Sequence, residues 1–394
     1  MRTTGVIARG ILTPILKQGD DLVQIVTDCL MRSAQCDGYS LQDGDIIGVT
    51  EAVVGRTQGN YATCEQIAQA LQAQFKPGPL GLVFPILSRN RFSILLKAMA
   101  IAAERLFILL SYPADEVGNE LVPHEAVAQK GVNPYSGCLT EPEFRGLFGW
   151  DYVHPFTGVD YIQLYKEFGP HIEILFSNDP LSILTYTRQV LCCDIHTRER
   201  TRAMIQAAAP DARVLTMQDI LREPVGGSGW SEYGLLGSNK ATEDKVKLFP
   251  RDTHHIVTAI QQEMLKRTGK LMEVLVYGDG CFKDPVGGIW ELADPVVSPA
   301  YTAGLEGTPH EIKIKYAADN EFADLSGDAL SEALRSLILE KDALTAHDMA
   351  AEGTTPRRLR DLVGSLCDLT SGSGDRGTPV VLIQNYFKNF ASED

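Results

Sequence analysis

The sequence predicts a mixed α/β protein with more than one folding unit. Short apolar runs, with the length and β-branched character of buried strands, alternate along the chain with amphipathic stretches of helix length. Such alternation is typical of sheets that are covered by helices. The chain has 394 residues, which is longer than one hydrophobic core normally spans, so we expect two or more subdomains.

Composition and charge narrow the classes of function. Apolar residues make up 44% of the chain and charged residues 22%, which is typical of a soluble globular protein. The net charge of −15 argues against nucleic acid as the main partner, because phosphate backbones need a basic surface. A nucleotide needs only a local basic pocket. The longest apolar stretch, Phe92–Tyr112, contains Lys97, Glu104 and Arg105, so no membrane span is predicted.

The cysteines indicate a reducing compartment. Eight are scattered along the chain, no CxxC pair occurs, and Cys192 and Cys193 are adjacent. This arrangement is typical of neither a zinc site nor a disulfide framework. The N-terminus, MRTTGVIARGILTPI, is too weakly apolar to predict a signal peptide. We therefore expect a cytoplasmic protein.

Helix and strand patterns are clearest in the first third and the last third of the chain. Asp20 and Asp21 start the first helix, and Lys76–Pro79 ends the second. The expected elements, in order, are an extended piece over 11–22, a helix to Arg32, a strand Ile46–Thr50, a helix Tyr61–Gln74, a strand Leu80–Leu87, a helix Phe92–Ala103, a strand Leu106–Ser111, a strand Ile172–Phe176, a loop Gly234–Pro250, a helix Thr253–Arg267, a strand Glu273–Tyr277, a helix Gly327–Glu340, a helix from Arg358 and a strand Pro379–Gln384.

Each of three polar segments can be interpreted in two ways. Ser88–Arg91 precedes an apolar helix, where its arginines either hold an anion or are solvated loop charges; we favour the second. His196 near Asp194 is either a metal or acid–base pair or, as is more common for a lone histidine among charges, structural. The run Ser371–Gly377 either offers backbone N–H groups to an anion or is a flexible loop, and Gly226–Gly229 predicts a flexible junction.

The segment after the strand Glu273–Tyr277 is the strongest candidate site. Asp279, Asp284 and Asp294 follow that strand together with Lys283. Open α/β sheets bind ligands at the carboxyl ends of their strands, and carboxylates beside a lysine suit a hard cation and a phosphate. An ordinary polar turn is the alternative. No Walker-type, dinucleotide or nucleophile-elbow motif occurs, which leaves Mg²⁺- or Mn²⁺-dependent handling of a phosphate as the predicted chemistry.

Several segments, in order, resemble the gamma-glutamyl ligases that add L-glutamate to the deazaflavin coenzyme F-420. These segments are PILKQGDDL from Pro14, DGDIIGVTEAVVGRTQG from Asp43, GLLGSN from Gly234 followed by LFPRD from Leu248, VLVYGDGCFKD from Val274, and the helix, glycine loop and strand over 358–385. The resemblance predicts a gamma-glutamyl-ligase-like core over 1–85 and 230–394. Residues 86–229 would then form an inserted α/β subdomain.

The resemblance implies a ligase that uses GTP or ATP with Mg²⁺ or Mn²⁺ to activate a carboxylate as an acyl phosphate, which the glutamate amine then attacks. It also implies a homodimer. By resemblance, the metal would be held by Asp279, Asn239 and Asp284, and the catalytic cations would be Lys283 and Arg56. The nucleotide would be bound by Lys17, Asp20, Asp21, Arg56, Ser238, Asn239 and Lys240.

The sequence departs from the family pattern at the metal. Leu236 and Gly237 stand where the family has an aspartate and a glutamate, and Arg56 replaces a lysine. A hard cation that loses a carboxylate binds weakly unless another replaces it, and the candidates are Asp115, Glu116, Asp194 and Asp284. The acceptor is either an F-420 precursor or another acid such as a folate or pterin. The alternatives are an enzyme of this fold with different phosphate or carboxylate chemistry and a non-catalytic nucleotide-binding protein.

Overall fold

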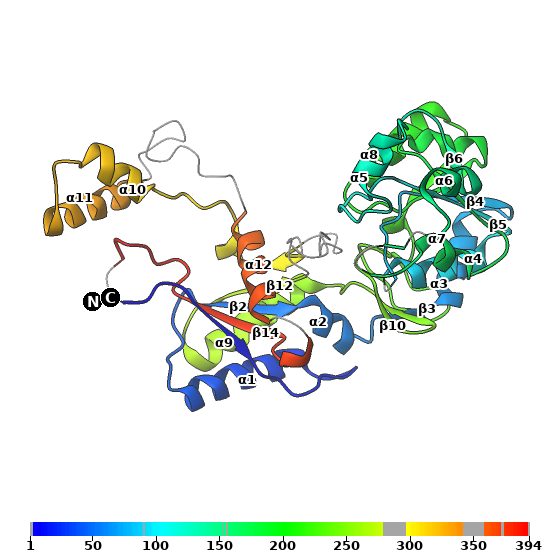
Figure 1. Cartoon of the computed structure of the whole chain (residues 1–394). Helices are drawn as coiled ribbons and strands as arrows, with labels where there is room; N and C mark the ends of the chain where they lie inside the picture. The colour runs from blue at the N-terminus through cyan, green and yellow to red at the C-terminus, as the bar shows by residue number, and fades with distance from the viewer. Residues whose placement is uncertain are drawn as a thin grey trace.

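The computed structural model describes residues 3–89, 91–151, 153–154, 157–278, 297–341, 358–371 and 374–392. Two α/β lobes are visible, each built on its own sheet, with a small third sheet at the base of the second lobe (Figure 1). The mixed α/β class predicted from the sequence is confirmed.

The first lobe is built on a five-stranded sheet with the order β1-β14-β2-β12-β13. β2 and β12 are parallel, and the other neighbours are antiparallel. Its strands are β1 Ile7–Ile11, β2 Ile46–Thr50, β12 Glu273–Tyr277, β13 Ala300–Tyr301 and β14 Val380–Gln384. All five residues of β14 are buried, as is typical of a strand that is covered on both faces.

Helices cover both faces of this sheet. α1 (Leu22–Asp37) and α9 (Thr253–Thr268) pack on one face, and α12 (Leu359–Ser371) packs on the other. Alternate strand residues supply the two cores, since Ile47 faces α1 and α9 whereas Ile46 faces α12. The remaining helices of this half are α2 Glu51–Thr57, α10 Ile314–Tyr316 and α11 Gly327–Leu339.

Gly48 in β2 allows α12 to approach the sheet, because a Cβ atom there would overlap the thiol of Cys367. We predict that Gly48→Ala lowers the free energy of unfolding by about 1–3 kcal/mol through overpacking. Urea titration would measure this loss. Gly146→Ala is the matched control, since a Cβ atom at Gly146 meets nothing within 4 Å. Equal stability of the two variants would contradict the prediction.

The small sheet corrects two sequence-based expectations. β3 (Tyr61–Thr63), β10 (Asn239–Thr242) and β11 (Lys245–Lys247) form an antiparallel sheet with the order β10-β11-β3. Residues 61–63 were predicted as helix and 234–250 as loop, so both predictions were wrong there. The physical reason is that β11 pairs with β3, from which it is distant in sequence. The helix α3 (Cys64–Gln74) begins only after the capping box of Thr63.

The second lobe is built on a six-stranded sheet with the order β6-β7-β5-β4-β8-β9, in which all neighbours except β6 and β7 are parallel. The five parallel strands therefore have the order third, second, first, fourth and fifth along the chain, which is that of a doubly wound fold. The strands are β4 Pro79–Val83, β5 Arg105–Leu110, β6 Leu139–Thr140, β7 Ile172–Phe176, β8 Gln189–Cys192 and β9 Arg213–Thr216. β4 is the first strand of this sheet in the sequence and precedes residue 86, where the inserted subdomain was expected to begin. The division into domains stays a prediction.

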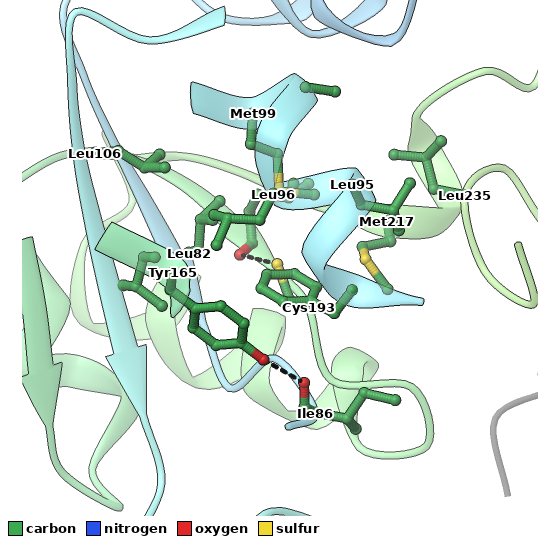
Figure 2. Packing of buried hydrophobic residues seen from close by; sticks show 14 of the residues in the cluster. Leu82, Ile86, Leu95, Leu96, Met99, Leu106, Tyr165, Cys193, Met217 and Leu235 are labelled. Carbon is green, nitrogen blue, oxygen red and sulfur yellow. Dashed lines mark hydrogen bonds between the residues drawn. The ribbon is translucent and has the colours of Figure 1, made fainter. Parts of the chain in front are cut away.

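A continuous apolar core fills one side of this sheet. Figure 2 shows side chains from strands, helices and loops meeting there, with the Tyr165 hydroxyl donating to the carbonyl of Ile86 at 3.4 Å. Leu235 and Leu236 belong to the same core, so the segment from Gly234 is anchored in the second lobe. The helices of this lobe are α4 Phe92–Ala102, α5 His124–Gln129, α6 Glu141–Phe148, α7 Tyr161–Lys166 and α8 Arg198–Ala208.

Candidate functional site: a cationic pocket at the edge of the five-stranded sheet

Several strands of the five-stranded sheet begin or end at the same edge. β1, β2 and β12 run in the same direction and end there, and β14 begins there. A pocket of about 770 Å³ opens at this edge and continues onto the small sheet. It is lined by Thr13, Pro14, Ile15, Leu16, Thr50, Ala52, Val53, Arg56, Tyr61, Asn239, Lys240, Ala241, Thr242, Lys245, Lys247, Ser371, Gly377, Thr378 and Pro379.

Hydrogen bonds between its loops shape the rim of the pocket. The Thr50 amide donates to the carbonyl of Pro379 at 3.0 Å, and the Thr13 amide donates to that of Gly377 at 3.3 Å. The Thr378 hydroxyl donates to the carbonyl of Ser371 at 3.1 Å. These bonds tie the ends of β1, β2, β14 and α12 together, so the rim is held by neighbouring strands rather than by one loop.

The pocket is strongly cationic. Arg56, Lys240, Lys245 and Lys247 line it, and none of its described lining residues is an aspartate or a glutamate. The protein as a whole carries a net charge of −15. A local concentration of positive charge in an acidic protein attracts anions such as phosphates and carboxylates.

The four cations differ in their partners. The Lys247 ammonium lies 2.9 and 2.7 Å from the two carboxylate oxygens of Glu51, and these side chains are only 11% and 5% exposed. Lys240 pairs with the exposed Glu243 at 2.7 Å. Within the described part of the chain, the exposed Arg56 guanidinium makes no ion pair or side-chain hydrogen bond. Lys245 makes no ion pair with a described residue either, but its ammonium lies 4.6 Å from the centroid of the Tyr61 ring. Arg56 and Lys245 are therefore the cations of this pocket without a carboxylate partner among the described residues.

Among the residues predicted to bind nucleotide, the structure brings Arg56, Asn239 and Lys240 together at this pocket. Asn239 and Lys240 begin β10, while Arg56 lies in the last turn of α2. This juxtaposition depends on the pairing of β10 with β11 and of β11 with β3.

The other predicted nucleotide-binding residues do not line the pocket. The Lys17 amide donates to the carboxylate of Asp20 at 2.6 Å within a turn. Asp21 caps α1 by accepting a hydrogen bond from the Gln24 amide at 3.0 Å. The buried Ser238 hydroxyl donates to the carbonyl of Leu235 at 2.8 Å. Their roles in nucleotide binding stay predictions.

The predicted metal ligands are only partly within the described chain. Asp279, Lys283 and Asp284 lie outside the described residues. β12 ends at Tyr277, which pairs with Thr50, so the chain leaves this strand at the edge where the pocket opens. Asn239 lines the pocket.

The described residues do not by themselves provide a metal site. Leu236 is fully buried in the core of the second lobe and offers no oxygen ligand. No group of three or more His, Cys, Asp or Glu side chains within the described ranges is arranged to hold a metal ion. Asn239 is thus the one proposed metal ligand that the described residues place at the pocket.

Of the acidic residues considered as replacements for the lost aspartate, Asp115, Glu116 and Asp194 form hydrogen bonds within the second lobe, and Asp284 lies outside the described residues. Asp115 accepts hydrogen bonds from the amides of Leu87, Val117 and Asn119, and burial raises its pKa to about 6. The carboxylate of Glu116 accepts bonds from three consecutive amides just before α8, those of residues 195–197. Neither carboxylate lines the cationic pocket.

Asp194 is also engaged within the second lobe. One carboxylate oxygen accepts bonds from the hydroxyls of Thr197 and Thr201, both at 2.7 Å. Burial raises the pKa of Asp194, since the charged form loses hydration. The backbone amide of His196 donates to Glu116 at 3.1 Å. These contacts favour the structural interpretation of the His196–Asp194 segment.

Sequence reasoning missed Lys245 and Lys247 as pocket residues. Both were placed in a loop, although the alternation Lys-Val-Lys is a strand pattern that directs two lysines to the same face. Glu51, within the motif from Asp43, was given no role, whereas it begins α2 and its carboxylate contacts the Lys247 ammonium.

The fold and the pocket define an α/β protein with a cationic pocket at the edge of a mixed sheet. The model of one protein family, F420-0:gamma-glutamyl ligase, matches residues 10–385, and the chain therefore belongs to this ligase family. The resemblance identified in the sequence is confirmed, and the match runs through residues 86–229. No curated protein matches the chain. None of the helices in the described part of the chain has the length and apolarity needed to cross a membrane.

Proposed function

We propose that this protein is a nucleotide-dependent ligase that joins L-glutamate to a carboxylate acceptor, such as an F-420 precursor or a folate. The observation that carries the proposal is the cationic pocket at the sheet edge of a chain from a gamma-glutamyl ligase family. The pocket would hold the phosphates of GTP or ATP. Among its cations, Arg56 suits this role, because a guanidinium matches phosphate oxygens in a bidentate manner.

The proposed reaction has two steps. An oxygen of the acceptor carboxylate attacks the terminal phosphorus of the nucleotide, the bond to the nucleoside diphosphate breaks, and an acyl phosphate forms. The glutamate amine, after losing a proton to solvent, then attacks the acyl carbon, and inorganic phosphate leaves as the amide forms. Negative charge shifts among phosphate oxygens in both steps, so fixed cations such as Arg56 and Lys247 would lower the barrier.

The proposal is tested by mixing the protein with GTP or ATP, Mn²⁺, L-glutamate and candidate acids. The first step can release one equivalent of nucleoside diphosphate with the acid alone, so we expect steady-state release of nucleoside diphosphate and inorganic phosphate only when both an acid and glutamate are present. Lack of acid-dependent turnover across F-420 precursors and folates would contradict the proposal. Steady-state turnover that requires an acid but does not require glutamate would favour an enzyme of the same fold with different chemistry. The replacement of the family's aspartate by Leu236 is the sequence feature that supports this alternative.

Mg²⁺ or Mn²⁺ is part of the proposal through Asp279, Asp284 and Asn239. A divalent ion would neutralise phosphate oxygens when bound. Of these three residues, Asn239 lines the cationic pocket. We predict that Mn²⁺ with nucleotide raises the unfolding midpoint of the wild type and that Asp279→Ala removes the Mn²⁺-dependent part of this shift. A full shift in the Asp279→Ala protein would show that this carboxylate does not hold the metal.

A thermal-shift comparison also separates the remaining alternative. A non-catalytic nucleotide-binding protein would be stabilised by GTP or ATP but would turn over no acid. The homodimer implied by the family and the cytoplasmic location stay predictions. Sedimentation at several protein concentrations would test the homodimer.

A further inference from the structure

A second pocket lies next to the cationic pocket. Its volume is about 470 Å³, and its lining includes Gln18, Gln66, Trp230 and Arg251. Tyr61 and Lys245 line both pockets. These two residues belong to β3 and β11 of the small sheet, so that sheet forms a wall that the two pockets share.

The buried side-chain amide of Asn60 holds together the residues around the second pocket. Asn60 is fully buried, and its side-chain oxygen accepts bonds from the Trp230 amide at 3.0 Å and from the Arg251 guanidinium at 2.6 Å. Its side-chain nitrogen donates to the carbonyl of Phe249 at 2.8 Å. The Gly229 amide donates to the carbonyl of Tyr61 at 2.7 Å. The glycine-rich segment before Trp230 is thus fastened to the end of α2 and the start of β3.

Gly229 makes this arrangement possible. A Cβ atom there would overlap the side chain of Asn60. The carbonyl of Gly226 accepts a further bond from the side-chain amide of Gln66 at 2.8 Å. The pocket wall is therefore a defined structure made of close backbone approaches, which an unconstrained linker would not provide.

Two cations from different elements line this pocket, since Lys245 belongs to β11 and Arg251 precedes α9. The Lys245 ammonium lies 4.6 Å from the centroid of the Tyr61 ring, and the Arg251 guanidinium lies 5.9 Å from that of Trp230. Neither cation forms an ion pair with a described residue, and none of the described lining residues is acidic. Two cations that have no acidic partner among the described residues, beside the side-chain amides of Gln18 and Gln66, are suited to a molecule with two carboxylates.

We infer that the second pocket binds a small dicarboxylate of the class to which L-glutamate belongs, beside the nucleotide. The inference rests on the proposed function and assigns its amino-acid substrate to a defined set of residues. Because Tyr61 and Lys245 border both pockets, a molecule in one lies next to a molecule in the other. Ligation needs this proximity, since the amine must reach the activated carboxyl group.

The test compares two affinities by calorimetry, that for L-glutamate and that for a non-hydrolysable nucleotide, in variants that affect one pocket or the other. Arg251→Met removes a cation that lines only the second pocket, and we expect it to weaken glutamate binding by about tenfold or more without changing nucleotide affinity. Arg56→Met should have the opposite pattern. Lys245→Met should weaken both. L-glutamine, which lacks the second carboxylate, should bind the wild type more weakly than L-glutamate.

Two further variants control for folding. Arg251→Lys retains the positive charge and should keep much of the affinity for glutamate. Gln18→Glu adds a negative charge at an exposed lining position and should weaken glutamate binding even if Arg251→Met proves unstable. Unchanged glutamate affinity in both Arg251→Met and Gln18→Glu, or no glutamate binding by the wild type with nucleotide present, would overturn the inference. Glutamate binding that is sensitive to Arg251 in a protein that binds no nucleotide would support this pocket while contradicting the proposed ligase.

Discussion

Replacement of Arg56 by methionine is expected to lower nucleotide-dependent turnover on the order of a hundredfold or more, because a fixed cation at transferring phosphates typically contributes that much. Arg56 lines the cationic pocket, is exposed, and has no ion-pair partner within the described residues. Its guanidinium therefore forms no ion pair that holds the described part of the fold. The loss should occur in catalysis and nucleotide affinity, with the unfolding midpoint unchanged.

Two variants sharpen this prediction. Arg56→Lys keeps the charge but loses the planar fork of donors, so its activity should lie between those of the wild type and Arg56→Met. Arg32→Met removes an exposed arginine from α1 that does not line this pocket and should leave turnover unchanged. Steady-state release of nucleoside diphosphate would measure all three. Equal turnover of the Arg56→Met and Arg32→Met proteins would exclude a role for Arg56 at the phosphates.

Replacement of Glu51 by leucine is expected to lower the free energy of unfolding by about 3 kcal/mol. Lys247 contacts both carboxylate oxygens of Glu51, and both side chains are almost fully buried. Removal of the carboxylate leaves a buried ammonium without its counter-charge, and the desolvation cost of that charge is then no longer offset. Chemical unfolding followed by far-UV circular dichroism would measure the loss.

The double variant Glu51→Leu with Lys247→Met separates the ion pair from simple packing. Because it removes both charges, it should recover at least half of the lost stability, whereas independent contributions would add. A double variant that is less stable than Glu51→Leu alone would contradict this explanation. The same double variant should bind nucleotide weakly even when it is well folded, because Lys247 also lines the pocket.

Elements with strong local signals agreed with the structure. β2, β7 and β12 have the predicted bounds, and α9 begins at the predicted residue, Thr253. An apolar run or an amphipathic period is a property of neighbouring residues, so it is visible without the rest of the fold. The strand expected over Leu80–Leu87 was too long, because β4 ends at Val83 and Phe84 adopts a positive φ of 55°.

The candidate site was predictable only in part. Arg56, Asn239 and Lys240 came from the family resemblance, and the pocket contains all three. Lys245 and Lys247 escaped notice because their strand is short and gains its hydrogen bonds from β3 and β10. The hydrogen-bond partners of such a strand lie elsewhere in the chain, so local periodicity carries little information about it.

The linear chain was sufficient to establish the α/β class, elements with strong local signals such as β2, β7, β12 and α9, and membership of the ligase family. Each of these depends on residues that are close in sequence or on ordered motifs. Only the tertiary structure shows that Glu51 contacts Lys247 and that Tyr61 and Lys245 lie between two pockets. Those contacts join segments nearly two hundred residues apart, as the separation of 196 residues between Glu51 and Lys247 illustrates. They arise because strand pairing and burial act through space, and the positions of the charges at the pocket depend on that pairing.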